Sequence, residues 1–279
     1  MASLKEMFSP RDMSEGLPWK RIVEFSVPML LGNIAQQLYN TVDSIVVGRY
    51  VGDNALAAVG SAGPIMNLLL VFFVGISTGA GILVSQYFGA KDREKLSMTI
   101  GNCITLTILS SIVVMIVGPL VTYPLLSVMG TPASIIDWCA DYLIIFFVGS
   151  AGFVFYGILR GLGDAFSALG FLLLATVLNI VLDVWFVVGF HMGVAGVALA
   201  TVVSQIISAI CCLIKLYKMR DIFDMNRTVL RPHKGYMAQI VKLGLPSGVT
   251  QAIFSLAMVV VQSLTNSFGE LFIACNVII

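Results

Sequence analysis

The sequence predicts an all-α membrane protein, built as a six-helix transmembrane bundle followed by the first helices of a second bundle. Of the 279 residues, 58% are hydrophobic and 11% are charged, whereas a soluble domain carries about 25% charged residues. The apolar residues also gather in runs of roughly 20 or more, the length of a helix that crosses a bilayer. These runs are too long and too evenly apolar for the strands of a transmembrane barrel.

The apolar runs define the helices that we expect. Complete helices are expected at 22–47, 61–87, 98–126, 136–159, 166–190, 193–218 and 239–268. A further helix begins near Leu271, and the chain ends inside it, so we expect a truncated second bundle. Residues 1–21 are mixed in charge and contain no apolar core of signal-peptide length, so we expect no cleaved leader.

The distribution of Lys and Arg predicts the orientation in the membrane. If the N-terminus is placed in the cytoplasm, 15 of the 16 Lys and Arg residues fall in cytoplasmic segments, and only Arg49 lies outside. The positive-inside rule therefore predicts a multi-pass protein of the cytoplasmic membrane, with its N-terminus in the cytoplasm. The net charge of +1 gives no indication of a nucleic-acid partner.

An internal repeat predicts two parallel bundles. The segment that ends at Pro28 resembles the segment that ends at Pro246, 218 residues later. The apolar run after each proline reaches a glycine followed by an acid, at Gly52 and at Gly269, 217 residues apart. Six crossings between the two copies return the chain to the same side, so the copies are expected to be related by an axis along the membrane normal.

The repeat divides the chain into four expected parts. They are a cytoplasmic N-terminal segment at 1–21, an N-terminal lobe of six helices at 22–218, a cytoplasmic linker at 219–238, and the start of an incomplete C-terminal lobe at 239–279. We expect the basic linker to be solvated; contact with anionic lipid headgroups is the alternative. Because alternating access needs two bundles that rock against each other, the missing part of the second lobe would be required for transport.

Prolines and glycines mark places where helices bend or pack closely. The second apolar run contains a glycine-rich stretch at Gly75–Gly81. Small residues let neighbouring helices approach closely within a membrane. Pro28 and Pro246 interrupt the backbone ladder and can kink their helices. The sequence leaves open whether these residues serve bending during transport or packing alone.

Two carboxylates lie in stretches that are otherwise suited to lipid. Asp43 shares the stretch 26–50 with only one other charge, Arg49 near its end, and Asp183 is the only charge in 165–190. Each acid lies seven residues before the end of its apolar run, which is about 10 Å below the same membrane surface. A charge at that depth is costly unless it faces protein or water, so such a residue is a functional-site hypothesis. Two acids at matching depth predict one shared site.

Further polar residues are expected at the same depth. Asn179 lies four residues before Asp183 and shares its helix face, and Thr201 reaches a similar depth on the sixth helix. Carboxylate, amide and hydroxyl oxygens are the ligands that a small hard cation needs, and two close carboxylates can instead share a proton. The sequence does not choose between Na⁺ and H⁺. For Thr201 alone, a hydrogen bond that merely joins helices is the favoured alternative.

These residues resemble those of multidrug and toxic compound extrusion (MATE) transporters along essentially the whole chain. Pro28 is followed by Asp43, and four segments then come in the family's order and spacing. They are GDNALAAVG at 52–60, LRGLGD at 159–164, NIVLD at 179–183 and GVAGVALATVVSQ at 193–205. The resemblance implies twelve helices in two lobes, and export of drugs or metabolites in exchange for Na⁺ or H⁺. The chain departs from the family pattern because its second lobe is incomplete.

The resemblance also implies roles for individual residues. The cation site of the family's bacterial and archaeal members carries over onto Asp43, Asn179, Asp183 and Thr201, which the depth argument also selects. Tyr142 matches a position that the family associates with its central cavity. We expect the substrate cavity to be lined by Gln36, Tyr39, Asn40, Tyr142 and Gln205. The expected substrate is a small organic cation or amphiphile, with no organic cofactor and no metal beyond Na⁺ at the cation site.

Two other functions remain open at this point. A flippase for lipid-linked saccharides, from the same superfamily, would need a basic groove, and no Lys or Arg is expected within the membrane. A non-transporting membrane scaffold would be compatible with an incomplete second lobe. We do not expect an enzyme, because the sequence contains no nucleophile-base arrangement, phosphate-binding loop or metal motif.

Overall fold

Long helices connected by short turns make up the described part of the chain. The computed structural model describes residues 17–149, 162, 164–219, 221–226 and 228–278, and every regular element in these ranges is helical. The all-α architecture is therefore confirmed. The helices are α2 (Pro18–Tyr50), α3 (Asp53–Gly89), α4 (Arg93–Val128), α5 (Ile136–Gly149), α7 (Ala165–Val184), the π-helical turn η2 (Trp185–Gly189), α8 (Gly193–Lys218), α9 (Lys234–Asn266) and α10 (Glu270–Ile278).

Several of these helices are long and apolar enough to cross a bilayer, which confirms a multi-pass membrane protein. By length and composition the spans are Asp53–Val71, Arg93–Val128, Phe166–Gly189, Gly193–Lys218 and Lys234–Asn266. Each predicted apolar run corresponds to a helix. The predicted helix at 136–159 begins as expected with α5, and its second half lies outside the described residues.

The starts of two helices differ from the predictions, because local residues such as proline, glycine and an acid, and not the length of the apolar run, determine where these helices begin. α2 begins at Pro18 and so includes the last residues of the predicted N-terminal segment. Proline is favourable in the first turn, where its missing N–H is not needed. α3 begins at Asp53, eight residues before its predicted start, directly after Gly52. An acid in the first turn interacts favourably with the helix dipole.

The internal repeat is supported by the backbone at its two glycines. Gly52 has φ +113° and Gly269 has φ +89°, a region of backbone space that favours glycine. Each glycine directly precedes a helix whose first residue is acidic. The same sharp turn thus recurs at equivalent positions of the two copies.

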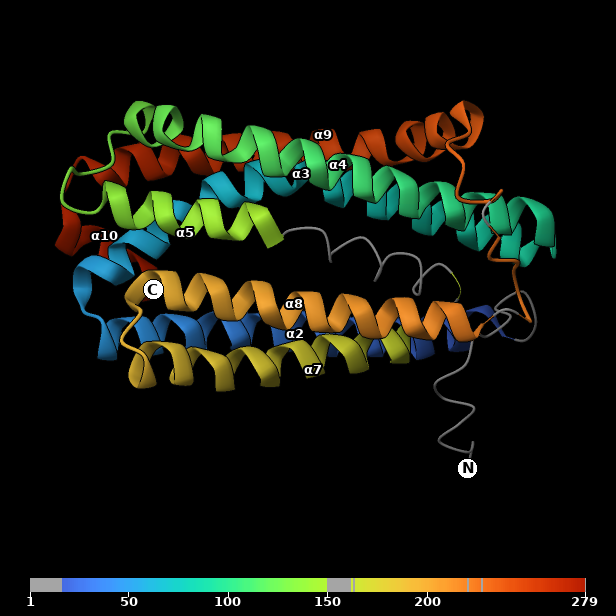
Figure 1. Ribbon diagram of the computed structural model, residues 1–279, viewed down its shortest axis with the longest axis horizontal. Coiled ribbons are helices and arrows are strands. Elements are labelled where there is room, and N and C mark those ends of the chain that lie inside the picture. Colours follow the sequence, from blue (N-terminus) through green and yellow to red (C-terminus); the bar gives the residue numbers. More distant parts are fainter. Residues whose placement is uncertain (1–16, 150–161, 163, 220, 227, 279) are drawn as a thin grey trace.

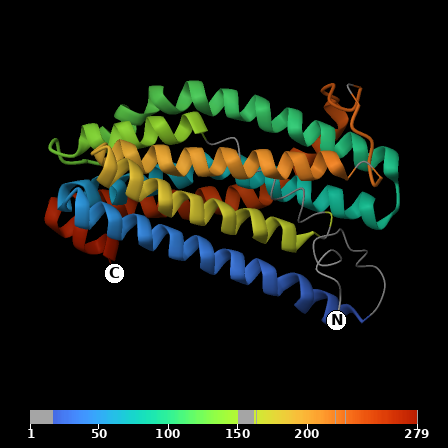
Figure 2. The same cartoon turned by 60° about the horizontal axis from the view of Figure 1, so that its bottom comes forward.

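The helices lie roughly along one common axis in two groups (Figure 1). α3, α4, α5 and α9 form one group, and α2, α7 and α8 form the other. The groups meet where α5 packs against α8 and where α2 contacts α3. Turning the molecule shows α2 along one edge beside α7 (Figure 2). This arrangement brings α2, α3, α5 and α8 around a common space.

α9, the first helix of the predicted second lobe, packs along α3 of the first bundle. At one end the Tyr87 hydroxyl donates to Gln239 Oε1 at 3.3 Å. In the middle, the glycines of the two helices meet, so the close packing expected of the Gly75–Gly81 stretch is confirmed. The start of the second lobe is therefore in contact with the first over most of the length of α3.

Most described residues of the linker are exposed, as the sequence predicted, but part of it docks on α4. Arg93 donates to both carboxylate oxygens of Asp224, at 2.8 and 3.3 Å. These hydrogen bonds hold the pKa of Asp224 below its usual range. The Asp224 N–H donates to Ser97 Oγ at 2.8 Å, and the neighbouring Phe223 is fully buried. The sequence did not reveal this docking because the anchoring groups lie on α4, more than a hundred residues away.

A second set of contacts holds the end of the linker. The Thr105 hydroxyl donates to the Leu230 carbonyl at 2.8 Å, and the His233 N–H donates to Asn102 Oδ1 at 2.6 Å. His233 is the residue that precedes α9. Asn102 is fully buried, so its carbonyl fixes where α9 begins.

We expect Asn102→Ala to release the end of the linker while leaving the bundle folded. The change removes the acceptor of the part-buried His233 N–H, and such a hydrogen bond contributes about 0.5–1.5 kcal/mol. Amide exchange in peptides covering 228–237 should then accelerate up to about tenfold in hydrogen–deuterium exchange, while α4 and α5 stay protected. Asn54→Ala, at an exposed position of α3, is the matched control. Unchanged protection of 228–237 would contradict this role of Asn102.

Candidate cation and substrate site

The two intramembrane acids meet across one asparagine. Asp43 comes from α2, and Asp183 and Asn179 come from α7. With its amide nitrogen toward the acids, Asn179 donates to Asp43 Oδ1 at 3.0 Å and to Asp183 Oδ2 at 3.3 Å. This orientation satisfies both sides because carboxylates are acceptors. Because both carboxylates accept hydrogen bonds from one nitrogen, the two acids belong to one cluster.

Both acids are removed from water, and neither has a cationic partner. Asp43 is 6% exposed and Asp183 is 0% exposed. Among the described residues, Lys and Arg pair with other acids and not with these two. The second oxygen of Asp183, Oδ1, is buried and has no hydrogen-bond partner in the described part of the chain. A buried carboxylate is unfavourable unless it is paired or protonated, so a cation or a proton would stabilise this pair.

Thr201 and Tyr39 complete the polar cluster. Thr201 Oγ1, on α8, lies 3.4 Å from the far end of the Asn179 amide and donates to the Val197 carbonyl at 3.1 Å. The Tyr39 hydroxyl, one turn before Asp43 on α2, donates to Thr201 Oγ1 at 3.4 Å. The structure thus brings together Asp43, Asn179, Asp183 and Thr201 from three helices, as the depth argument predicted. Their role as ligands of a cation stays a prediction.

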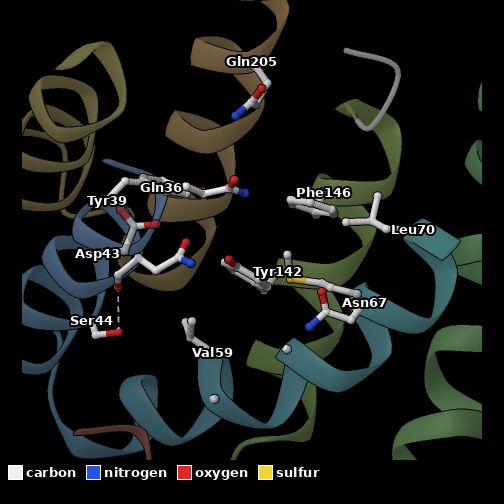
Figure 3. A pocket seen from close by; sticks show the side chains of 14 residues that line it. Gln36, Tyr39, Asp43, Ser44, Val59, Asn67, Leu70, Tyr142, Phe146 and Gln205 are labelled. Atoms are coloured by element: carbon white, nitrogen blue, oxygen red, sulfur yellow. Dashed lines mark hydrogen bonds between the residues drawn. The ribbon is translucent and has the colours of Figure 1, made fainter. Parts of the chain in front are cut away.

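A cavity of about 290 Å³ opens beside this cluster, between α2, α3, α5 and α8 (Figure 3). That volume is near the lower end of the range for small-molecule sites. The stacked rings of Tyr142 and Phe146, with centroids 6.5 Å apart, form one wall. Asp43 belongs to both the cavity and the acid pair, whereas Asn179, Asp183 and Thr201 lie behind it. The lining residues are Gln36, Tyr39, Asn40, Asp43, Ser44, Val59, Gly60, Gly63, Met66, Asn67, Leu70, Tyr142, Phe146 and Gln205.

The five residues predicted to line a cavity all do so, but sequence reasoning missed the contribution of α3. Asn67 and Met66 come from α3, and Phe146 comes from the helix turn after Tyr142. Two signals could have identified them. Asn67 is an amide inside a long apolar run, and Phe146 lies four residues after Tyr142 on the same face.

α7 changes its winding directly after Asp183. Its α-helix ends at Val184, and Trp185–Gly189 continues as a π-helical turn. The sequence predicted one uninterrupted helix at 166–190. Such turns insert an extra residue into the backbone ladder and often occur near functional sites. The turn lies next to the acid that carries the unpartnered oxygen.

Comparison with known families identifies the chain's relatives. The MatE family model matches residues 28–185, more than half of the chain. The chain belongs to the MATE family of transporters. The matched range includes most of α2 and all of α3, α4, α5 and α7, and therefore both acids of the cluster.

Known MATE proteins match most of this chain. The probable multidrug resistance protein YoeA of Bacillus subtilis is 32% identical over 281 residues, covering 97% of this chain and 61% of that protein. The inward-facing structure of a multidrug resistance MATE family transporter has a TM-score of 0.82 at 29% identity, covering 92% of this chain and 60% of that one. The outward-facing structure of such a transporter has a TM-score of 0.81 at 30% identity, covering 87% and 55%. The chain thus spans about three fifths of the length of the curated relative.

Proposed function

We propose that this chain provides the first bundle, and the start of the second, of a cation-coupled antiporter that exports small organic molecules. The observation that carries the proposal is the double position of Asp43. It hydrogen-bonds with Asn179 in the acid pair, and it also lines the cavity. A cation bound to the pair and a positively charged substrate in the cavity would therefore act on the same carboxylate.

Coupling follows from that shared group. When a cation from outside neutralises Asp43 and Asp183, the cavity loses the charge that attracts a positive substrate. The substrate is then released, and binding of a new substrate favours release of the cation. Such a cycle works only if each ligand binds the two states differently. Because the chain resembles inward-facing and outward-facing structures almost equally, the bundle is suited to move as a unit.

Both Na⁺ and H⁺ are compatible with this site. A proton shared between the carboxyl groups would favour the Asn179 amide nitrogen facing them, the orientation that satisfies the hydrogen bonds of both carboxylates. A bound Na⁺ would need oxygen ligands, so Asn179 would have to turn its carbonyl toward the acids. The Asn179 amide would therefore point its nitrogen toward the acids when the coupling ion is H⁺, and its carbonyl oxygen when the ion is Na⁺.

The composition of the cavity favours a cationic, partly aromatic substrate over an anionic one. Among the described lining residues Asp43 is the only charged one, and aromatic rings face it from α5. A lipid-linked saccharide flippase would need basic groups for the phosphates of its substrate, and the described part of the lining includes none. Multidrug export, the activity named for the relatives, agrees with a lining of this kind.

The proposed location is the cytoplasmic membrane, with the N-terminus and the linker inside. The excess of Lys and Arg on that side supports this orientation. The acid pair would then lie in the outer half of the membrane, where a cation from outside has the shorter path.

We expect Asp183→Asn to abolish gradient-driven efflux without loss of protein. The change keeps the volume of the side chain and removes the charge that binds the cation. The measurement is efflux of a fluorescent organic cation from membrane vesicles of cells that express the gene encoding this chain, under an imposed Na⁺ or H⁺ gradient. At equal protein level we expect a loss of at least about tenfold for Asp183→Asn, and a smaller loss for Thr201→Val, since one hydroxyl is one ligand among several.

Asp141→Asn is the matched control, because it removes an exposed carboxylate of α5 that does not line the cavity. Wild-type efflux in Asp183→Asn under both gradients would sink the proposal. Loss of protein in place of loss of efflux would show that Asp183 serves the packing of α7. The gradient that drives the wild type identifies the coupling ion.

A further inference from the structure

The end of the linker is held at the depth where lipid headgroups lie. The Leu230 carbonyl and the His233 N–H are bonded to Thr105 and Asn102 of α4. α4 has 36 residues and is therefore about 54 Å long, whereas the hydrocarbon core of a bilayer is about 30 Å thick. If α4 is centred in the bilayer, about 12 Å of it projects on each side, and Asn102 lies about 13 Å from its start. Residues 230–234, the linker end, thus lie at the membrane surface.

Two cations of the linker end are held in place by these anchors. Arg231 follows the anchored Leu230, and Lys234 follows the anchored His233. Both cations are exposed, and within the described part of the chain neither forms an ion pair with an acid. Figure 1 shows the linker, in orange, crossing the end of the bundle where α4 begins. Because the backbone beside both cations is fixed on α4, binding of one anion between them costs less conformational entropy than binding to a free loop.

An apolar surface continues from these cations along α9. Lys234 is the first residue of α9, and Ala238, Val241 and Leu245 follow it at spacings of four, three and four residues. These spacings place the four residues on one face of the helix. The three apolar residues are exposed. Cations beside an exposed apolar face match the two parts of a phospholipid, whereas a soluble anion would use the cations alone.

We propose that the linker end is a binding site for an anionic phospholipid, whose phosphate is held by Arg231 and Lys234. This inference goes beyond the proposed function and rests only on the location proposed there for the linker. The Arg231 guanidinium suits a phosphate because it offers two parallel N–H donors, and the Lys234 ammonium adds a second positive charge. The acyl chains lie along the apolar face of α9. A zwitterionic phospholipid is bound less well, because its headgroup also carries a positive charge.

Native mass spectrometry tests this inference on the purified protein, mixed with equal amounts of phosphatidylglycerol and phosphatidylcholine of the same chain length. In the wild type, the first bound lipid should be phosphatidylglycerol with a preference of about ten- to thirtyfold, the range for two cations next to an anionic headgroup. In the double variant Arg231→Gln/Lys234→Gln, this preference should fall below about threefold. Lys20→Gln/Lys218→Gln is the matched control, because it removes two exposed cations from α2 and α8 on the same predicted side of the membrane. It should keep the wild-type preference.

A further variant separates a built site from the general attraction between a basic surface and anionic lipid. Asn102→Ala keeps every cation of the linker end and removes one of its two anchors. Because the anchors hold the cations in place, the preference should fall by about threefold or more although the net charge is unchanged. Inorganic phosphate in large excess should leave the preference of the wild type unchanged, since it has no chains to place on α9.

The outcomes separate this inference from its alternatives. No preference in the wild type, or an equal preference in the wild type and Arg231→Gln/Lys234→Gln, would overturn it. An equal loss in the two double variants, or an unchanged preference in Asn102→Ala, would show diffuse attraction in place of a site. Displacement of the lipid by inorganic phosphate would show that the ligand is a soluble anion. Because binding is measured without transport, neither this result nor that of the efflux experiment decides the other.

Discussion

Gly79→Ala should destabilise the protein by about 1–3 kcal/mol, the range for overpacking a close contact. A methyl group at this position would lie 2.8 Å from the Gly244 backbone nitrogen, and closer still to the Ile240 carbonyl oxygen. Both are backbone atoms of α9, so no side-chain rotation can relieve the clash. Gly244 meets the backbone of Gly75 in the same way. α3 and α9 would have to separate at their closest point.

Gly63→Ala is a control within the same helix, because a methyl group at Gly63 would have no neighbour within 4 Å. Alanine is the better helix former by about 1 kcal/mol, so this variant should be neutral or slightly more stable. The measurement is thermal unfolding in detergent with a thiol-reactive dye, which reports exposure of the buried Cys103 and Cys139. Equal melting temperatures for the two variants would contradict the close contact between α3 and α9.

The fold could be predicted from the sequence because a lipid bilayer places a simple constraint on the helices that cross it. A helix that crosses the bilayer needs a long apolar run, and those runs can be read without knowledge of their neighbours. The Gly52 and Gly269 turns also follow from local backbone chemistry. The starts of α2 and α3 did not follow, since they depend on local residues such as Pro18 and Gly52 and not on the apolar runs. The docked linker did not follow either, because its anchors, such as Asn102, are distant in sequence.

Residues of the candidate site could be predicted from the sequence where their side chains are energetically unfavourable in a membrane. Asp43 and Asp183 stand out because a carboxylate in an apolar run is unfavourable unless it serves a function. Their depth in the membrane could be calculated from the ends of those runs. Asn179 and Thr201 followed from helix periodicity. Asn67 and Phe146 were not predicted, although both left a signal in the sequence, because neither an amide nor an aromatic ring is as costly in a membrane helix as a carboxylate. That Asp43 faces the cavity while Asp183 lies behind it required the packing of α2 on α7.

The contact of α9 with the first bundle is the feature that sequence reasoning missed most clearly. The repeat assigned α9 to a second lobe, and equivalence to α2 correctly predicted its direction and the turn that follows it. Repeat symmetry contains no information about which helices of the two lobes touch. Here that contact depends on glycines in the middle of α3 and on polar side chains at one end, where Asn266 lies.

Asn266→Leu should detach the end of α9 from α3 and lower the stability by about 2–3 kcal/mol. Asn266 is 3% exposed, and its amide uses its full bonding capacity. Its Oδ1 accepts from Ser61 Oγ at 3.3 Å and from Gln262 Nε2 at 3.0 Å, and its Nδ2 donates to the Met129 carbonyl at 3.1 Å and to Thr131 Oγ1 at 3.5 Å. Each group left unpaired costs about 1–3 kcal/mol in a soluble core, but single hydrogen bonds within membranes average nearer 0.6 kcal/mol. Four hydrogen bonds at the membrane average give the expected loss of about 2–3 kcal/mol.

A serine pair separates hydrogen bonding from simple burial in this experiment. Ser61 is fully buried and bonded to Asn266, whereas Ser255 is 1% exposed on α9 and its hydroxyl has no partner within the described ranges. Ser61→Ala should therefore lower the melting temperature in the same dye assay, by less than Asn266→Leu. Ser255→Ala should leave it unchanged or raise it, since removing an unpaired hydroxyl removes an unfavourable burial. Equal effects of the two serine variants would mean that apolar packing, and not the network around Asn266, holds α9 against α3.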